Sequence, residues 1–140
     1  MLRYHSKTLQ LLGIEHRRSP SAVQAVAQAE DRIGRALPDS VREWYELENA
    51  CHILHEHSNG DPPLDISEFG QPQRDNHGGG PHDLLADDLL LFRWENQRVC
   101  AWAIRLDGSD DPPVVVDLDT QFRSSKESAL AFSQHLYAWM

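Results

Sequence analysis

The sequence predicts an α+β domain in which a central, mainly antiparallel sheet is flanked by N-terminal and C-terminal helices. Helical periodicity dominates the chain as far as His57, two-residue alternation begins at Leu89, and helical spacing returns near the C-terminus. Strands that cluster along a chain, instead of alternating with helices, are typical of α+β folds. We expect one domain over residues 19–140, preceded by an N-terminal extension over residues 1–18.

Two helices are predicted before Pro38. A short one is expected around residues 7–12. A longer one begins at Ser19-Pro20, because serine is a favoured cap and proline suits the first helical position. Its apolar residues recur at helical spacing until Pro38 ends it. These residues are Val23, Val26, Ala29, Ile33 and Leu37.

A further helix is predicted directly after Pro38. Ser40 and Glu43 have the spacing of a capping box, in which each side chain accepts a hydrogen bond from the other residue's backbone. The helix, or a successor after a bend near Asn49, is expected to continue towards His57.

Residues 60–83 interrupt the regular pattern. They hold five of the eight glycines and four of the eight prolines, and only residues 65–69 are expected to form a short strand or turn. Long irregular connections in compact domains are usually functional or disordered. This segment therefore competes with the contact sites predicted elsewhere.

Three strands are predicted between residues 89 and 116. Alternating apolar side chains define the first over residues 89–94 and the second over residues 99–104, and the short polar break between them indicates a hairpin. A polar loop then leads through Pro112-Pro113 into the third strand at residues 114–116. Trp94 and Trp102 are expected in the core.

A final helix is predicted from residue 124 to the C-terminus. Ser124 and Glu127 repeat the capping-box spacing, and apolar residues recur behind them. The predicted inner stripe is Ala129, Leu130, Ser133, Leu136, Tyr137 and Met140.

Acidic residues outnumber basic ones, and they do so unevenly. The chain has 22 acidic and 13 basic residues, a net charge of −9, and residues 19–140 alone carry −12. An acidic body disfavours nucleic acid, whose phosphates need basic side chains, and disfavours anionic membranes. It favours a basic protein partner, because complementary charge speeds encounter, although acidity also serves solubility alone.

The expected compartment is the cytoplasm. The N-terminus lacks the apolar core of a signal peptide, and no stretch approaches the roughly 20 apolar residues that span a bilayer. Cys51 and Cys100 are the only cysteines, and their spacing does not indicate a disulfide scaffold; whether they pair is left open.

No pattern for catalysis, metal binding or cofactor binding is complete. His52, His55 and His57 with Glu56 are the densest group of metal-ligand types, but they lack the spacing of a zinc-hydrolase motif. An exposed histidine cluster is the favoured interpretation. The HGGG at residues 77–80 lacks the GxSxG elbow that an oxyanion loop would accompany, so a linker is favoured. We expect no catalytic residue, no metal and no cofactor.

Polar residues crowd two turns between the predicted strands. Residues 95–98 form the hairpin tip, where turn chemistry is favoured over recognition. Residues 107–111 form the next loop, where capping aspartates are favoured over a calcium site. An acidic surface built from both turns is the predicted contact site for a partner. Its residues are Glu95, Asn96, Gln97, Arg98, Asp107, Asp110 and Asp111.

Four segments together resemble the SUKH superfamily of fungal cell-wall-synthesis regulators and bacterial immunity proteins. They are ALPDSVREWYEL (36–47), LLFRWENQRVCAWAI (90–104), DPPVVVD (111–117) and SALAFSQHL (128–136). The likeness covers roughly residues 20–140. Its most specific part is the ENQ hairpin followed by a tryptophan and the DPPV strand entry. Arg98 stands where members often have glycine.

The resemblance implies an α+β fold without catalysis. It also implies an immunity role, in which the protein binds and neutralises the cognate toxin of a bacterial polymorphic toxin system, often a nuclease. Nucleases are typically basic because they hold phosphates, so an acidic binder suits them. The alternatives are a regulatory scaffold that binds another protein and, less favoured, a histidine-dependent metal hydrolase.

Overall fold

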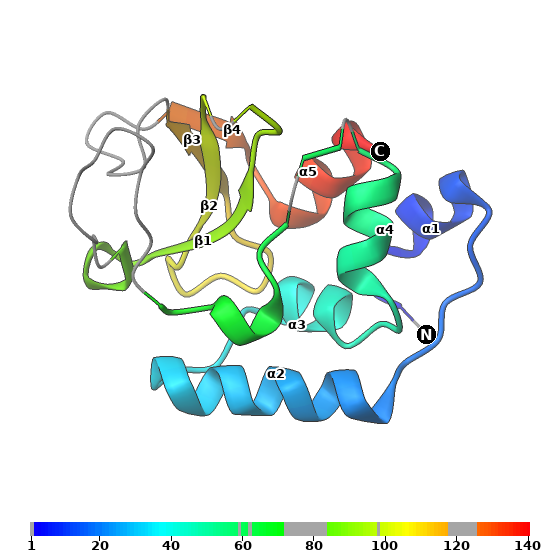
Figure 1. The fold of residues 1–140 in the computed structure, drawn as a ribbon, viewed down its shortest axis with the longest axis horizontal. Coiled ribbons are helices and arrows are strands. Elements are labelled where there is room, and N and C mark those ends of the chain that lie inside the picture. Colours follow the sequence, from blue (N-terminus) through cyan, green and yellow to red (C-terminus); the bar gives the residue numbers. More distant parts are fainter. Residues whose placement is uncertain (1, 59, 62, 72–83, 98, 118–125) are drawn as a thin grey trace.

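The computed structural model describes residues 2–140 except 59, 62, 72–83, 98 and 118–125. Within the described residues, five α-helices flank a four-stranded antiparallel sheet, which confirms the predicted α+β class (Figure 1). The elements are α1 (Ser6–Leu12), α2 (Pro20–Ile33), α3 (Asp39–Tyr45), α4 (Ala50–Glu56), β1 (Leu89–Trp94), β2 (Ala101–Arg105), β3 (Val114–Asp117), β4 (Lys126–Ala129) and α5 (Phe132–Trp139), with short 3-10 helices at Ile66–Glu68 and Leu84–Asp87.

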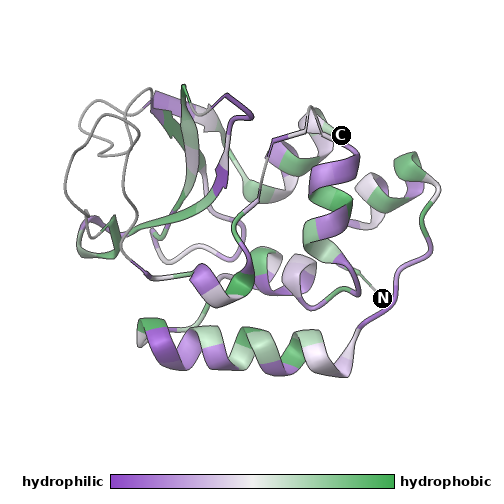
Figure 2. Cartoon of the chain, in the orientation of Figure 1, coloured by the Kyte–Doolittle hydropathy of each residue, from purple (hydrophilic) through white to green (hydrophobic). Residues whose placement is uncertain are grey.

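The sheet is a meander with strand order β1-β2-β3-β4. Leu91 lies opposite Ala103, which in turn lies opposite Val115. Every residue of β1 is buried, so both faces of this strand are covered. On one face Phe92 meets Phe132 of α5 edge to face, at 5.4 Å between ring centres. Figure 2 shows the central strands as mostly hydrophobic and α2 as a mixture of both kinds of residue.

Helix α2 begins where the sequence predicts and ends earlier. The Ser19 hydroxyl accepts the Ala22 N–H, and Pro20 occupies the first helical position. The helix ends at Ile33 because Gly34 adopts a left-handed conformation, with φ +75°. Leu37 therefore lies beyond the helix, yet it is buried in the core.

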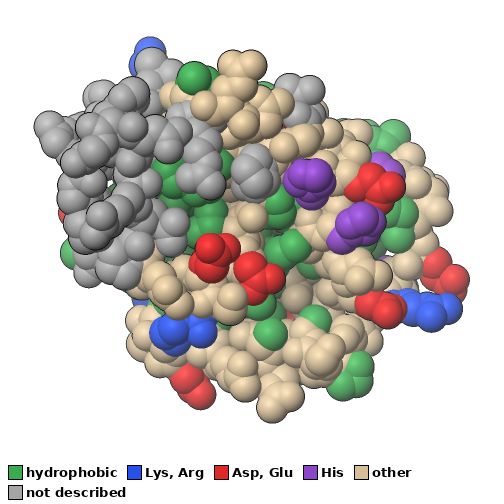
Figure 3. Space-filling model, in the orientation of Figure 1, with side chains coloured by type: hydrophobic (Ala, Val, Ile, Leu, Met, Phe, Trp, Pro, Cys, Tyr) green, Lys and Arg blue, Asp and Glu red, His purple; other side chains and the backbone are tan. Residues whose placement is uncertain are grey.

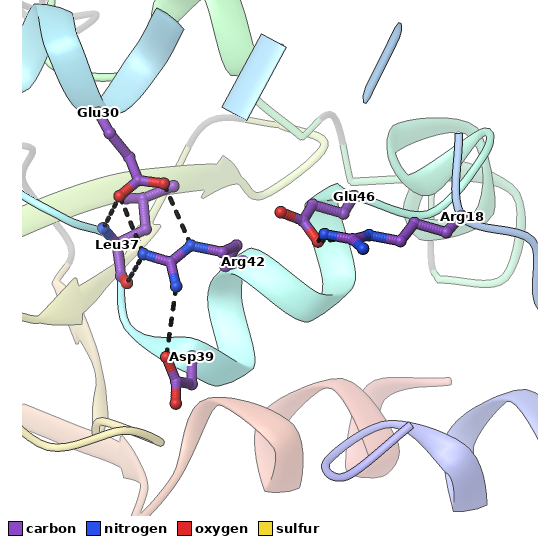
Figure 4. A network of polar contacts seen from close by, with 6 residues as sticks. All are labelled: Arg18, Glu30, Leu37, Asp39, Arg42 and Glu46. Carbon is purple, nitrogen blue, oxygen red and sulfur yellow. Dashed lines mark hydrogen bonds and ion pairs between the residues drawn. The ribbon is translucent and has the colours of Figure 1, made fainter. Parts of the chain in front are cut away.

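A network of polar contacts joins α2 to α3 (Figure 4). Glu30 accepts the Leu37 N–H at 3.1 Å and receives Arg42 Nε and Nη2 at 3.1 and 3.0 Å. These hydrogen bonds raise the pKa of Arg42. One carboxylate therefore closes the turn at Pro38 and fixes the angle between the two helices.

The predicted capping box at Ser40 and Glu43 is wrong. Ser40 lies inside α3, whose N-cap is Pro38 and shows no side-chain cap. The Glu43 carboxylate instead accepts the backbone N–H groups of Arg3, Tyr4 and His5, at 2.7, 2.8 and 2.9 Å. The Glu43 carboxylate, which the local spacing assigns to a helix cap, therefore binds residues that are distant in sequence.

We expect Glu43→Gln to lower the free energy of unfolding by about 1.5 kcal/mol, because an amide offers one acceptor where the carboxylate offers two oxygens to three donors. Urea denaturation followed by circular dichroism measures the change. Asp88→Asn is the control, since Asp88 is exposed and pairs with Arg35 at the surface. Equal losses in both variants would contradict the assigned role of Glu43.

The N-terminal segment is part of the same core as the rest of the chain. Leu9 is buried in that core, and His5 is fully buried with its Nε2 2.7 Å from the Ser40 carbonyl oxygen. The His5 ring contacts both Trp44 and Phe132, at 5.1 and 5.7 Å between ring centres. Residues near the two ends of the sequence thus meet around one side chain.

The successor helix after Asn49 is confirmed as α4, and the bend before it is left-handed at Asn49, with φ 61°. Residues 65–69, expected as a strand or turn, form a single 3-10 turn with a capping box between Asp65 and Glu68.

The predicted start of the last helix is wrong. Glu127 lies in β4, opposite Val115, and α5 begins only at Phe132; Ser124 lies outside the described residues. Residues 126–129 pair with β3 as a strand instead of forming the first turn of the helix. The start of α5 is held instead by Asp111, whose carboxylate accepts both the backbone N–H and the hydroxyl of Ser133.

Candidate functional site

The hairpin tip is held by one carboxylate of its own and by one from a distant part of the chain. Glu95 accepts the backbone N–H groups of Gln97 and Val99, at 2.8 and 3.4 Å. Asp61 accepts the backbone N–H of Asn96 at 2.9 Å. Asn96 and Gln97 are exposed, and Arg98 lies outside the described residues. Carboxylates thus satisfy backbone groups of the turn, and the choice between turn chemistry and recognition at the tip stays a prediction.

The loop after β2 is also organised by capping aspartates. Asp107 accepts the backbone N–H of Ser109 at 3.0 Å and its hydroxyl at 2.6 Å, and these hydrogen bonds lower the pKa of Asp107. Asp111 is committed to the start of α5 through Ser133. Asp110 is exposed, while its carbonyl oxygen accepts the Ser40 N–H.

The two predicted contact regions lie at opposite ends of β2. The tip at residues 95–97 precedes β2 and the loop at residues 107–111 follows it. At about 3.4 Å per residue, β2 alone separates them by roughly 14 Å. A partner would have to cover at least that distance to contact both regions, and their role in binding stays a prediction. Trp94 and Trp102 between them are core residues, as predicted.

The histidine cluster lies on and just beyond α4. His52 and His55 are exposed, and His52 Nε2 lies 3.0 Å from a carboxylate oxygen of Glu56, one helical turn away. Among the described residues, no three His, Cys, Asp or Glu side chains are arranged to hold a metal ion. His77 and His82 of the following segment lie outside them.

Both cysteines are free thiols. Burial raises the pKa of Cys51 to about 11 and also raises that of Cys100. The thiolate is the nucleophilic form of cysteine, so neither side chain is primed for attack at neutral pH.

The structure has a hollow that includes part of the histidine cluster and that the sequence alone does not predict. A hollow of about 300 Å³ lies between α4 and the segment that follows α1. Figure 3 shows histidine and acidic side chains gathered over α4. We call this feature the α4 hollow, and the residues that line it are Leu9, Ile14, Glu15, His16, Arg17, Leu47, Glu48, Asn49, His52, Ile53, Glu56 and His57.

The α4 hollow combines an apolar part with acidic walls. Leu9, Leu47 and Ile53 are buried core residues, so the apolar part is continuous with the core. The lining residues include three glutamates and one arginine. The hollow is therefore suited to a group that is apolar along its length and positively charged at its end.

Backbone contacts assemble the acidic walls from separate parts of the chain. Arg18 and Leu47 form an isolated antiparallel bridge, and the Glu48 N–H donates to the Arg17 carbonyl oxygen at 2.7 Å. This pairing brings the exposed Glu15 next to the connection before α4, where Glu48 is exposed. Sequence reasoning missed the hollow because nothing in the local pattern predicts this bridge.

Comparison with protein-family models, curated proteins and solved structures finds no match for this chain. The helices in the described part of the chain all fall short of the length and apolar character that crossing a membrane requires. The SUKH resemblance thus stays a prediction.

Proposed function

We propose that this chain is a non-enzymatic immunity-type protein that binds a basic toxin domain in the cytoplasm and neutralises it. The observation that carries the proposal is the α4 hollow, where Glu15 and Glu48 stand exposed beside an apolar surface. The net charge of −9 and the SUKH-like segments support the same conclusion.

The physical basis of neutralisation is competition for a basic surface. A nuclease holds its substrate with lysine and arginine side chains, and an acidic protein can occupy the same side chains. A stable complex would bury roughly 1,600 Å² in total and exclude the substrate from that area. Such inhibition needs complementary shape and charge, and it needs no chemical step.

The test is to mix the purified protein with the toxin encoded by the neighbouring gene and to measure toxin activity. We expect stoichiometric inhibition whose affinity falls as salt rises, because exposed charges are screened over about 10 Å at 0.1 M salt. Full toxin activity in the presence of excess protein would contradict the proposal. Binding without inhibition would favour the regulatory scaffold instead.

Charge-removing variants identify which surface makes the contact. Glu15→Gln combined with Glu48→Gln is expected to weaken binding of the toxin about tenfold, since neither carboxylate has an ion-pair partner among the described residues and both are available to a basic partner. Calorimetric titration measures the affinity. Gln97→Ala at the tip and Asp110→Asn in the loop are the matched variants at the sequence-predicted sites. A larger loss in either would move the contact surface there.

A further inference from the structure

We propose that the α4 hollow is a socket for a single arginine side chain presented by the basic partner. This inference rests on the proposed function, because it names the group that the partner inserts. The aliphatic stem would lie against Leu9, Leu47 and Ile53, and the guanidinium would lie among the acidic walls.

The size of the hollow favours one side chain over a larger element. Its volume of about 300 Å³ is at the lower limit of pockets that hold small molecules. A helix or a strand needs a longer groove. One long side chain can fill the space while the rest of the partner lies on the surrounding surface.

The chemistry of the walls favours arginine over lysine. Glu15 and Glu48 line the hollow together with Glu56, which also contacts His52 Nε2, and a planar guanidinium offers five donors to such a set of carboxylates. The rings of His16, His52 and His57 also line it. Flat rings suit guanidinium stacking, and a guanidinium loses less hydration than an ammonium group on entering a partly apolar site.

Among the residues that line the hollow, Arg17 is the only arginine, and there is no lysine. It is exposed, and it belongs to the strand-like segment that forms one wall. Its positive charge repels a cation that enters the hollow. Removing its charge should therefore strengthen binding, which is the opposite of the effect expected for the glutamates.

The experiment titrates the full isotope-labelled chain with N-acetyl-arginine amide and follows backbone amide signals by NMR. We expect saturable shifts at Leu47, Asn49 and Ile53, with a dissociation constant on the order of 1 mM for a ligand this small. N-acetyl-lysine amide should bind more weakly. N-acetyl-citrulline amide, which has nearly the same shape without the charge, should give no saturable shifts.

Three variants make the test specific. Glu15→Gln with Glu48→Gln should weaken arginine amide binding at least about fivefold, and Arg17→Gln should strengthen it about twofold or more. Asp31→Asn removes an exposed charge on α2, outside the hollow, and should leave binding unchanged. Dispersed amide spectra establish that each variant is folded.

Two kinds of outcome would overturn the inference. One is a response without the expected selectivity: citrulline amide equal to arginine amide would show that charge plays no part, and lysine amide equal to arginine amide would show that the hollow does not prefer a guanidinium. The other is a response located at residues 95–97 or 107–111 instead of the hollow. Toxin inhibition without arginine amide binding would refute the socket and leave the proposed function intact, whereas amide binding without toxin inhibition would refute the function.

Discussion

Asp61→Ala is expected to lower the free energy of unfolding by about 3–5 kcal/mol, because it leaves the Arg93 guanidinium buried without its counter-ion. Arg93 is fully buried in β1, and its Nη2 lies 2.7 Å from a carboxylate oxygen of Asp61. The guanidinium also lies over the rings of Trp102 and Trp139, at 5.0 and 5.6 Å from their centres. Aromatic rings attract a cation but do not replace a carboxylate.

Urea denaturation at neutral pH measures this loss. Arg18→Ala is the control, because it breaks an ion pair whose arginine is 68% exposed and should cost less than about 1 kcal/mol. The double variant Asp61→Ala with Arg93→Met should recover part of the stability, since no unpaired charge then remains in the core. A double variant as unstable as the sum of the two single variants would contradict the ion-pair explanation.

The second large effect is a loss of stability in acid that originates at His135. Its ring is fully buried against Phe92, Trp102 and Trp139. Burial, and secondarily the positive charge of Arg93, lower the pKa of His135 to about 3. The folded protein therefore keeps this ring neutral at pH values where the unfolded chain, with a histidine pKa near 6.5, binds a proton.

The sign of the effect follows from that difference. Stability from the neutral ring is fully present above about pH 6.5 and is lost as the pH falls towards 3, at roughly 1 kcal/mol or slightly more per pH unit. At pH 5 the loss from His135 alone is about 2 kcal/mol. Burial lowers the pKa of His5 as well, so His5 adds a loss in the same direction.

Urea denaturation between pH 7.5 and pH 5 checks this prediction. His135→Phe should make stability less dependent on pH, because phenylalanine keeps the ring and removes the titrating group. His55→Gln, at an exposed position of α4, should leave the pH dependence as it is in the parent protein. A parent protein equally stable at pH 7 and pH 5 would refute the role of His135.

Local sequence signals correctly predicted the elements whose structure depends on residues within the element itself or directly beside it. The start of α2 depends on Ser19 and Pro20, which are adjacent. Strands β1, β2 and β3 were predicted because their apolar side chains contact the core directly. In these elements, the residues that make the sequence pattern are also the residues that make the contacts in the folded protein.

The features that escaped prediction depend on contacts that the local pattern of apolar residues does not encode. Strand β4 has only exposed and half-buried residues, and it exists because it pairs with its neighbour β3. Glu43 has capping-box spacing, but its donors come from residues 3–5. The α4 hollow requires the bridge between Arg18 and Leu47.

The position of His5 between Trp44 and Phe132 has a consequence for how the molecule is made. The His5 ring packs between two side chains that lie far from it along the chain, so it can reach its final surroundings only after both have been synthesised, and Phe132 is the later of the two. Contacts between residues so far apart in sequence slow folding, so we expect this segment to dock late.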